Sequence, residues 1–135
     1  TMSQPPRNLP ESMLAVLTAL WDQGPMTMRE LADDLYPTSG KSAISTVQKL
    51  LERLEDREYV QRKREGRLQI FRAVVSREQI IDEQLRSTAE RFCGGSITPL
   101  FSRLIQAKNL SRDECDELRA LIDELDQQNQ KKKRQ

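Results

Sequence analysis

Residues 41 to 72, KSAISTVQKLLERLEDREYVQRKREGRLQIFR, decide the fold of this chain. In the first half of this stretch, apolar residues recur at steps of three and four, which is the period of a helix with one buried face. These residues are Ile44, Val47, Leu50, Leu51 and Leu54. The second half is rich in β-branched and aromatic residues on either side of Gly66, a pattern typical of a hairpin. The stretch therefore predicts an amphipathic helix followed directly by two antiparallel strands.

The opposite face of the predicted helix combines short hydroxyl side chains with longer amide and basic side chains. Such groups suit hydrogen bonding to base edges and phosphates in a DNA major groove. They are Ser42, Ser45, Thr46, Gln48, Lys49 and Arg53. An ordinary solvated face is the alternative interpretation, because any surface helix is polar on one side.

The predicted strands span residues 59–63 and 68–75, and residues 64–67 connect them. Within eleven positions the hairpin concentrates five basic side chains, Arg62, Lys63, Arg64, Arg67 and Arg72. Because these charges repel one another, their concentration favours a polyanionic partner. A charged hairpin that is merely solvated is the alternative. For a DNA-contacting unit, the expected phosphate contacts fall on Lys41, Ser42, Arg53, Arg62, Lys63, Arg64 and Arg67.

The near-neutral total of 22 basic and 21 acidic residues hides a strong charge asymmetry. Residues 41–77 hold ten basic and five acidic side chains, a net charge of +5, whereas residues 1–40 hold two and five, a net −3. Residues 78–130 hold six and eleven, a net −5, and residues 131–135 add four basic side chains. The positive charge is therefore local, as expected for a confined nucleic-acid footprint.

Composition disfavours several other functional classes. The 135 residues contain no histidine, which removes the commonest general base and the commonest neutral metal ligand. Cys93 and Cys115 are too far apart for zinc or redox spacing, and Cys115 is expected to be packed on an apolar helix face. We therefore expect no catalytic residues, no metal site and no cofactor. Without a membrane-length apolar run or a signal-peptide pattern, the expected location is cytoplasmic.

Two shorter helices are predicted before the deciding stretch. The first runs from about Pro10 to Gln23 and is ended by Gly24-Pro25. The second begins with a capping-box pattern at Thr27 to Glu30 and continues to about Leu35, before a turn at residues 37–40. Three helices followed by a two-stranded wing predict a winged helix-turn-helix, so the fold class is mainly α with a small β-wing.

Three amphipathic helices are predicted after the wing, and little else in the chain could cover their apolar faces. Capping-box patterns at Ser76 and Ser111 open the first and the last of them, and Gly94-Gly95 ends the first. We expect an α-helical dimerisation domain, with a compact monomeric three-helix bundle as the alternative. The expected interface residues are Ile81, Leu85, Phe92, Leu100, Phe101, Leu104, Leu118, Leu121, Ile122 and Leu125.

These elements divide the chain into four expected segments. They are a disordered N-terminal segment at 1–8, a winged-helix domain at 9–75, a helical dimerisation domain at 76–128 and a basic disordered tail at 129–135.

Three strings, ALWDQGPMTMRELADDL (19–35), ISTVQKLLERLEDREYVQRKREGR (44–67) and VSREQI (75–80), resemble the penicillinase repressor family of bacterial transcription regulators. The Gly94-Gly95-Ser96 break and the Leu-Ser-x-x-Glu motif at 110–114 follow in the same order, so the resemblance extends over residues 9–125. It implies a homodimeric repressor on a palindromic operator in double-stranded DNA, with each third helix in a major groove. By this likeness, the base-reading positions are Ser45, Thr46, Gln48 and Lys49.

Three departures from the family pattern limit what the resemblance implies. Relatives usually carry glycine where this chain has Glu58, which predicts a longer or differently turned helix exit. The cysteine cluster of the copper-responsive branch is missing, which disfavours copper sensing. Ungapped matching places Arg103-Leu104 where the β-lactam-responsive members have a cleavable Asn-Phe step, so a regulatory protease partner is unsupported there.

The resulting hypothesis is a dimeric repressor that blocks polymerase at a near-palindromic promoter site, with the basic wing on the phosphate backbone. The rival hypothesis is a protein-interaction module whose basic hairpin docks an acidic protein partner, since fold alone does not define function. A gel shift with upstream promoter fragments at low salt would discriminate between the two hypotheses.

Overall fold

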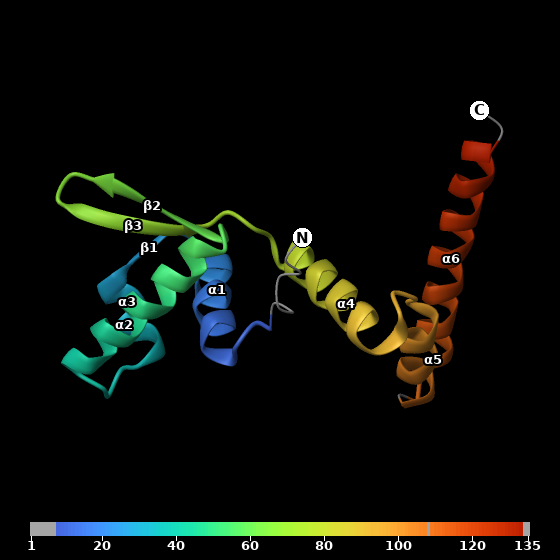
Figure 1. Cartoon of the computed structure of the whole chain (residues 1–135), viewed down its shortest axis with the longest axis horizontal. Coiled ribbons are helices and arrows are strands. Elements are labelled where there is room, and N and C mark those ends of the chain that lie inside the picture. Colours follow the sequence, from blue (N-terminus) through green and yellow to red (C-terminus); the bar gives the residue numbers. More distant parts are fainter. Residues whose placement is uncertain (1–7, 108, 134–135) are drawn as a thin grey trace.

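The computed structural model describes residues 8–107 and 109–133, so the expectation for residues 1–7 lies outside the described part. Along the chain the elements are α1 (Glu11–Gln23), β1 (Met26–Thr27), α2 (Met28–Leu35), α3 (Lys41–Asp56), β2 (Val60–Glu65), β3 (Leu68–Ala73), α4 (Arg77–Cys93), α5 (Thr98–Ala107) and α6 (Arg112–Lys133). Figure 1 shows α1, α2 and α3 gathered beside the small sheet, whereas α4 leads away to α5 and α6. The predicted winged helix followed by helices is confirmed.

The winged-helix unit has one hydrophobic core, to which α1, α2, α3 and the sheet all contribute. The predicted stripe of α3 is buried at Val47, Leu50, Leu51 and Leu54, whereas Ile44 is only partly buried. The side chains least accessible to solvent are Met13, Val16, Leu17, Leu31, Leu51, Leu54, Val47, Val60 and Phe71. Burying a side chain of this size contributes about 1.5 to 3 kcal/mol, so the core holds α3 firmly with its polar face outward.

The capping box at the start of α2 forms as predicted. The Thr27 hydroxyl accepts a hydrogen bond from the Glu30 backbone N–H at 3.1 Å, and a Glu30 carboxylate oxygen accepts from the Thr27 backbone N–H at 2.9 Å. The hydrogen bond from the Thr27 backbone N–H to the carboxylate, together with that from the Thr27 side chain, lowers the pKa of the Glu30 carboxyl. The box fixes the point at which the chain turns into the helix-turn-helix.

The sheet has three antiparallel strands in the order β1-β3-β2, so β3 is central. The two-residue strand β1, which pairs Met26 with Phe71, was not predicted because two residues carry no periodicity. The strands extend differently from the expectation: β2 continues two residues further toward the turn, and β3 ends two residues earlier. β2 and β3 stay paired as far as Glu65 and Leu68, so Gly66 and Arg67 alone form the turn. Gly66 has a φ of 63°, and a glycine at the first position is typical of two-residue hairpin turns.

The exit from α3 is a tight turn made without glycine. The Tyr59 N–H donates to the Leu54 carbonyl at 3.0 Å and the Glu58 N–H donates to the Glu55 carbonyl at 2.9 Å, which is the Schellman pattern. Glu58 has a φ of 63°, the left-handed conformation that glycine usually supplies there. The expected longer or differently turned exit is therefore wrong, because Glu58 itself adopts the glycine-like conformation.

Replacing Glu58 with glycine should stabilise the protein by about 1 kcal/mol. Removing the left-handed strain stabilises the folded state by about 1 to 3 kcal/mol. The greater freedom of glycine in the unfolded chain offsets about 0.5 to 1 kcal/mol of this gain. Chemical denaturation of Glu58→Gly and Glu58→Ala measures the effect. Alanine removes the charge but keeps the strain, so an equal gain in both variants would contradict the backbone explanation.

The N-terminal half of α4 is joined to the winged-helix unit. Ile80 is buried in its core, the Trp21 indole N–H donates to the Val75 carbonyl at 2.8 Å, and the Tyr59 hydroxyl donates to Glu83 at 2.6 Å. The capping box between Ser76 and Gln79 forms as predicted. The direction in which α4 leaves the winged-helix unit is therefore fixed by side-chain contacts as well as by the chain.

The last two helices have no core of their own within the described chain. None of the described residues of α5 and α6 is buried, so the alternative of a compact monomeric bundle is wrong for this chain. The predicted disorder from residue 129 is also wrong up to Lys133, because α6 continues that far. Lysines in the last turn interact favourably with the negative end of the helix. Among residues 8–107 and 109–133, no helix is both long and apolar enough to cross a membrane.

Candidate nucleic-acid interface

The polar face of α3 is open to solvent. Ser45, Thr46, Gln48 and Lys49 are all exposed, and so are Lys41, Ser42 and Arg53 at its two ends. The buried residues of the same helix alternate with them at helical spacing, so packing of the core forces these side chains outward. None of the four predicted base-reading residues is covered by another described part of the chain.

Two hydroxyls of this face are already oriented by the backbone. Ser42 Oγ donates to the Ser39 carbonyl at 2.7 Å, and Thr46 Oγ1 donates to the Ser42 carbonyl at 3.0 Å. Because each hydroxyl already donates its single proton to a backbone carbonyl, only its acceptor lone pairs remain for a bound partner. In the major groove such an acceptor suits the exocyclic amino group of adenine or cytosine.

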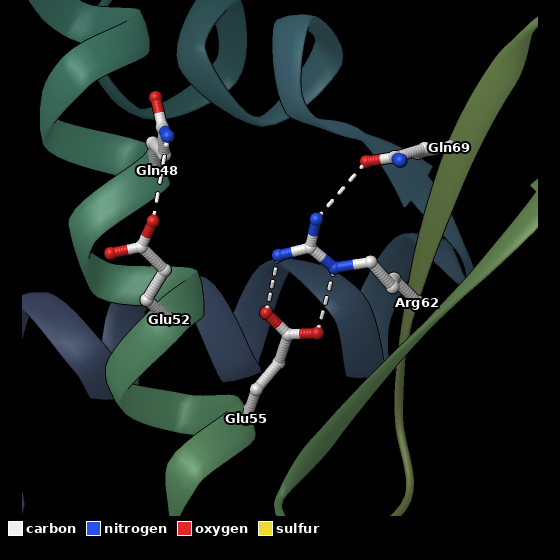
Figure 2. A network of polar contacts seen from close by, with 5 residues as sticks. All are labelled: Gln48, Glu52, Glu55, Arg62 and Gln69. Carbon is white, nitrogen blue, oxygen red and sulfur yellow. Dashed lines mark hydrogen bonds and ion pairs between the residues drawn. The ribbon is translucent and has the colours of Figure 1, made fainter.

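The remaining two residues of the central face differ in their freedom. The Gln48 side-chain amide donates to Glu52 across a long 3.4 Å hydrogen bond, which leaves its carbonyl oxygen available (Figure 2). No hydrogen bond or ion pair with another described residue holds the Lys49 ammonium. The face therefore offers hydroxyl acceptors, an amide and an exposed cation, which together match the mixed donors and acceptors of base edges.

The wing divides its basic residues between two faces, because side chains alternate along a strand. Arg62 is paired with buried Phe71 and Arg64 with Gln69, so both arginines lie on the face that looks toward the helices. Lys63 and Arg72 project from the opposite face, and Arg67 lies in the turn. All five are exposed. The basic hairpin is therefore not one cluster, as the sequence suggested, but two faces joined by a basic tip.

Arg62 is engaged inside the protein. Its Nε and Nη2 donate to the two carboxylate oxygens of Glu55 at 2.8 and 2.6 Å, and its Nη1 donates to Gln69 at 3.2 Å (Figure 2). The guanidinium carbon lies 5.1 Å from the centre of the Phe71 ring. The hydrogen bonds to Glu55, with the charges of Glu55 and Glu52, raise the pKa of Arg62 above its ordinary value. Of the seven predicted phosphate contacts, Arg62 has the most extensive bonding within the chain.

Three residues of this surface were missed in the sequence: Glu52, Glu55 and Gln69. Glu52 follows Gln48 by four positions, a spacing at which side chains meet on a helix, and this signal was readable. The contacts of Glu55 and Gln69 with Arg62 could not be predicted, because they depend on the register of the hairpin. A four-residue connection would have given a different register.

The predicted dimer residues lie on the surface of the single chain. Eight of the ten are exposed, and Leu100 and Leu118 are half-buried. Phe92 is 71% exposed and Leu121 is 60% exposed, unusual values for large apolar side chains. Cys115, expected to be packed, is half-buried on α6. Arg103 and Leu104, at the place of the cleavable step in relatives, are exposed on α5.

Comparison with known proteins agrees with this architecture. The family model described as penicillinase repressor matches residues 10–124. The penicillinase repressor of Bacillus licheniformis is 24% identical over 114 residues, which cover 84% of this chain and 88% of that relative. Members of the family are transcriptional regulators and not enzymes, and the protein-interaction alternative is not favoured. The chain therefore belongs to the penicillinase repressor family of DNA-binding transcriptional repressors.

Proposed function

We propose that this repressor binds a palindromic promoter site as a homodimer, with α3 of each protomer in a major groove and the wing on the phosphate backbone. The single observation that carries the proposal is the uncovered polar face of α3, which is held outward by the core on its other side. A bound dimer sets its two recognition helices about one helical turn apart, roughly 34 to 36 Å, and occludes the promoter from polymerase.

In this proposal the base-reading side chains are Ser45, Thr46, Gln48 and Lys49. The phosphate contacts come from Lys41, Ser42 and Arg53 at the ends of α3, and from Arg64 and Arg67 of the wing. Lys63, which the sequence also predicted as a phosphate contact, lies with Arg72 on the opposite face of the hairpin. Support for the wing contacts comes from the exposure of Arg64 and Arg67, neither of which forms a hydrogen bond or ion pair with a described residue. Phosphate contacts supply affinity that does not depend on sequence, whereas contacts to base edges supply specificity.

Support for the homodimer comes from the apolar stripes of α4, α5 and α6. Their large exposed residues include Ile81, Leu85, Phe92, Leu104 and Leu121, and no described element of the same chain covers them. Burying apolar surface contributes about 25 cal/mol per Å², so a second copy that packs against these stripes would gain strongly from association. A two-fold dimer also matches the two-fold symmetry of a palindrome.

The experiment that tests the proposal is a gel shift on DNA from upstream of the gene, at increasing salt. If each protomer neutralises about three phosphates, the plot of log affinity against log salt should have a slope near −5. No retardation of any upstream fragment at low salt would contradict the proposed function.

Arg64→Ala should weaken binding to cognate and shuffled DNA alike. Loss of one phosphate contact per protomer should make the salt slope of the dimer shallower by about two. Arg72→Ala is the matched control, because it removes the same charge from the opposite face of the same hairpin. Equal changes in slope for the two variants would show that the face of the wing does not matter.

A further inference from the structure

The outer part of the wing is weakly attached to the rest of the protein. Residues 61–69 are all exposed, so the hairpin beyond Val60 has no buried anchor until Phe71. On the side of α2, a cleft of about 590 Å³ separates the helix from the hairpin and is lined by Arg29, Asp33 and Arg67, among others. The base of the hairpin is held by Val60 and Phe71 in the core and by the pairing of β3 with β1, so only contacts outside the core can restrain the part beyond it.

Arg62 connects the wing to α3. Figure 2 shows its guanidinium between Glu55 on α3 and Gln69 on β3, while its own backbone belongs to β2. Two parallel hydrogen bonds between a guanidinium and a carboxylate restrict orientation as well as distance. The centre of the Phe71 ring on β3 lies 5.1 Å from the guanidinium carbon, so the ring packs against the same group. One side chain thus joins three elements across the open part of the wing.

We propose that Arg62 and Glu55 form a positioning pair that holds the wing at a fixed angle to the recognition helix, so that the contacts of both with DNA are made in one register. This inference rests on the proposed function. Arg62 then does not act mainly as a phosphate contact, because Glu55 neutralises its charge and three of its nitrogens already donate within the chain. The pair lies 40% and 24% exposed, so it adds little to fold stability and its loss should leave the protein folded.

The charge-conserving substitution Arg62→Lys separates positioning from phosphate binding. A lysine keeps the positive charge but cannot form the two-pronged contact with Glu55. If Arg62 positions the wing, Arg62→Lys should weaken operator binding about tenfold, nearly as much as Arg62→Ala. The salt slope should stay unchanged in Arg62→Lys, and binding to shuffled DNA should fall much less than operator binding.

The matched control is Arg72→Lys, the same substitution on the opposite face of the same hairpin. Arg72 is exposed and lies outside the proposed DNA contacts, so a lysine in its place should leave operator affinity unchanged. A double-mutant cycle of Arg62→Lys and Glu55→Gln adds a second test. The two losses in operator affinity should be non-additive, since each substitution breaks the same contact.

The experiment measures binding of the full chain to a duplex that carries the protected half-sites and to a shuffled duplex, with thermal denaturation as the check on folding. Full operator affinity in folded Arg62→Lys, or additive effects in the cycle, would overturn the positioning pair while the proposed function stands. Failure of the unsubstituted protein to prefer the half-site duplex would overturn the proposed function, and this inference with it.

Discussion

Leu121→Asp combined with Leu125→Asp is expected to split the dimer and to lower operator affinity by at least about 10³-fold, to the level of non-specific binding. Both leucines lie on one stripe of α6 and are more than half exposed in the single chain, at 60% and 57%. Each leucine contributes about 1.5 to 3 kcal/mol when buried, and an unpaired carboxylate in its place would carry a large desolvation cost. A monomer would hold only one half-site.

The oligomeric state is measured by analytical ultracentrifugation and the affinity by gel shift. Ala120→Asp is the matched control, since it places the same carboxylate on the opposite side of the same helix turn. It should leave both measurements unchanged. A double variant that still sediments as a dimer and still binds the operator would show that α6 does not form the interface.

Gln48→Ala is expected to weaken operator binding by about 1 to 3 kcal/mol per half-site and to relax specificity at the base pair that Gln48 contacts. The substitution changes no charge, so binding to shuffled DNA and the salt slope should stay as they are. Lys49→Ala should weaken operator binding to a similar extent, and it should also reduce binding to shuffled DNA because a charge is lost.

Binding to a set of operator duplexes, each with one base pair changed, measures this specificity. Arg64→Ala is the comparison, because loss of a phosphate contact should weaken all duplexes alike. If Gln48→Ala weakened cognate and shuffled duplexes equally, its assignment to base reading would be wrong.

The helices of the winged-helix unit could be predicted from the sequence because their cores and caps are local signals. The apolar steps from Val47 to Leu54 and the capping box at Thr27 each lie within one element, and both were found where expected. The outward face of α3 followed directly, since burial of one side of a helix exposes the other.

The sequence predicted the hairpin of the wing but not its register or its side-chain contacts. Shortening the connection from four residues to two changed which residues pair across the strands, and alternation alone did not say which face of the hairpin turns toward the helices. Arg62 therefore looked equivalent to Lys63 in the sequence, although one is bound to Glu55 and the other projects from the far face. Glu58 was misjudged because a tertiary turn can impose a left-handed backbone on a residue that disfavours it.

The central claim, that the polar face of α3 enters a DNA duplex, is tested most directly by hydroxyl-radical footprinting of the region upstream of the gene. Two protected half-sites are expected, with centres about 10 to 10.5 base pairs apart or a multiple of that distance. Ser45→Glu, which places a carboxylate on the same face, should abolish this protection. Protection that persists in Ser45→Glu, or no protection by the unsubstituted protein at low salt, would contradict the claim.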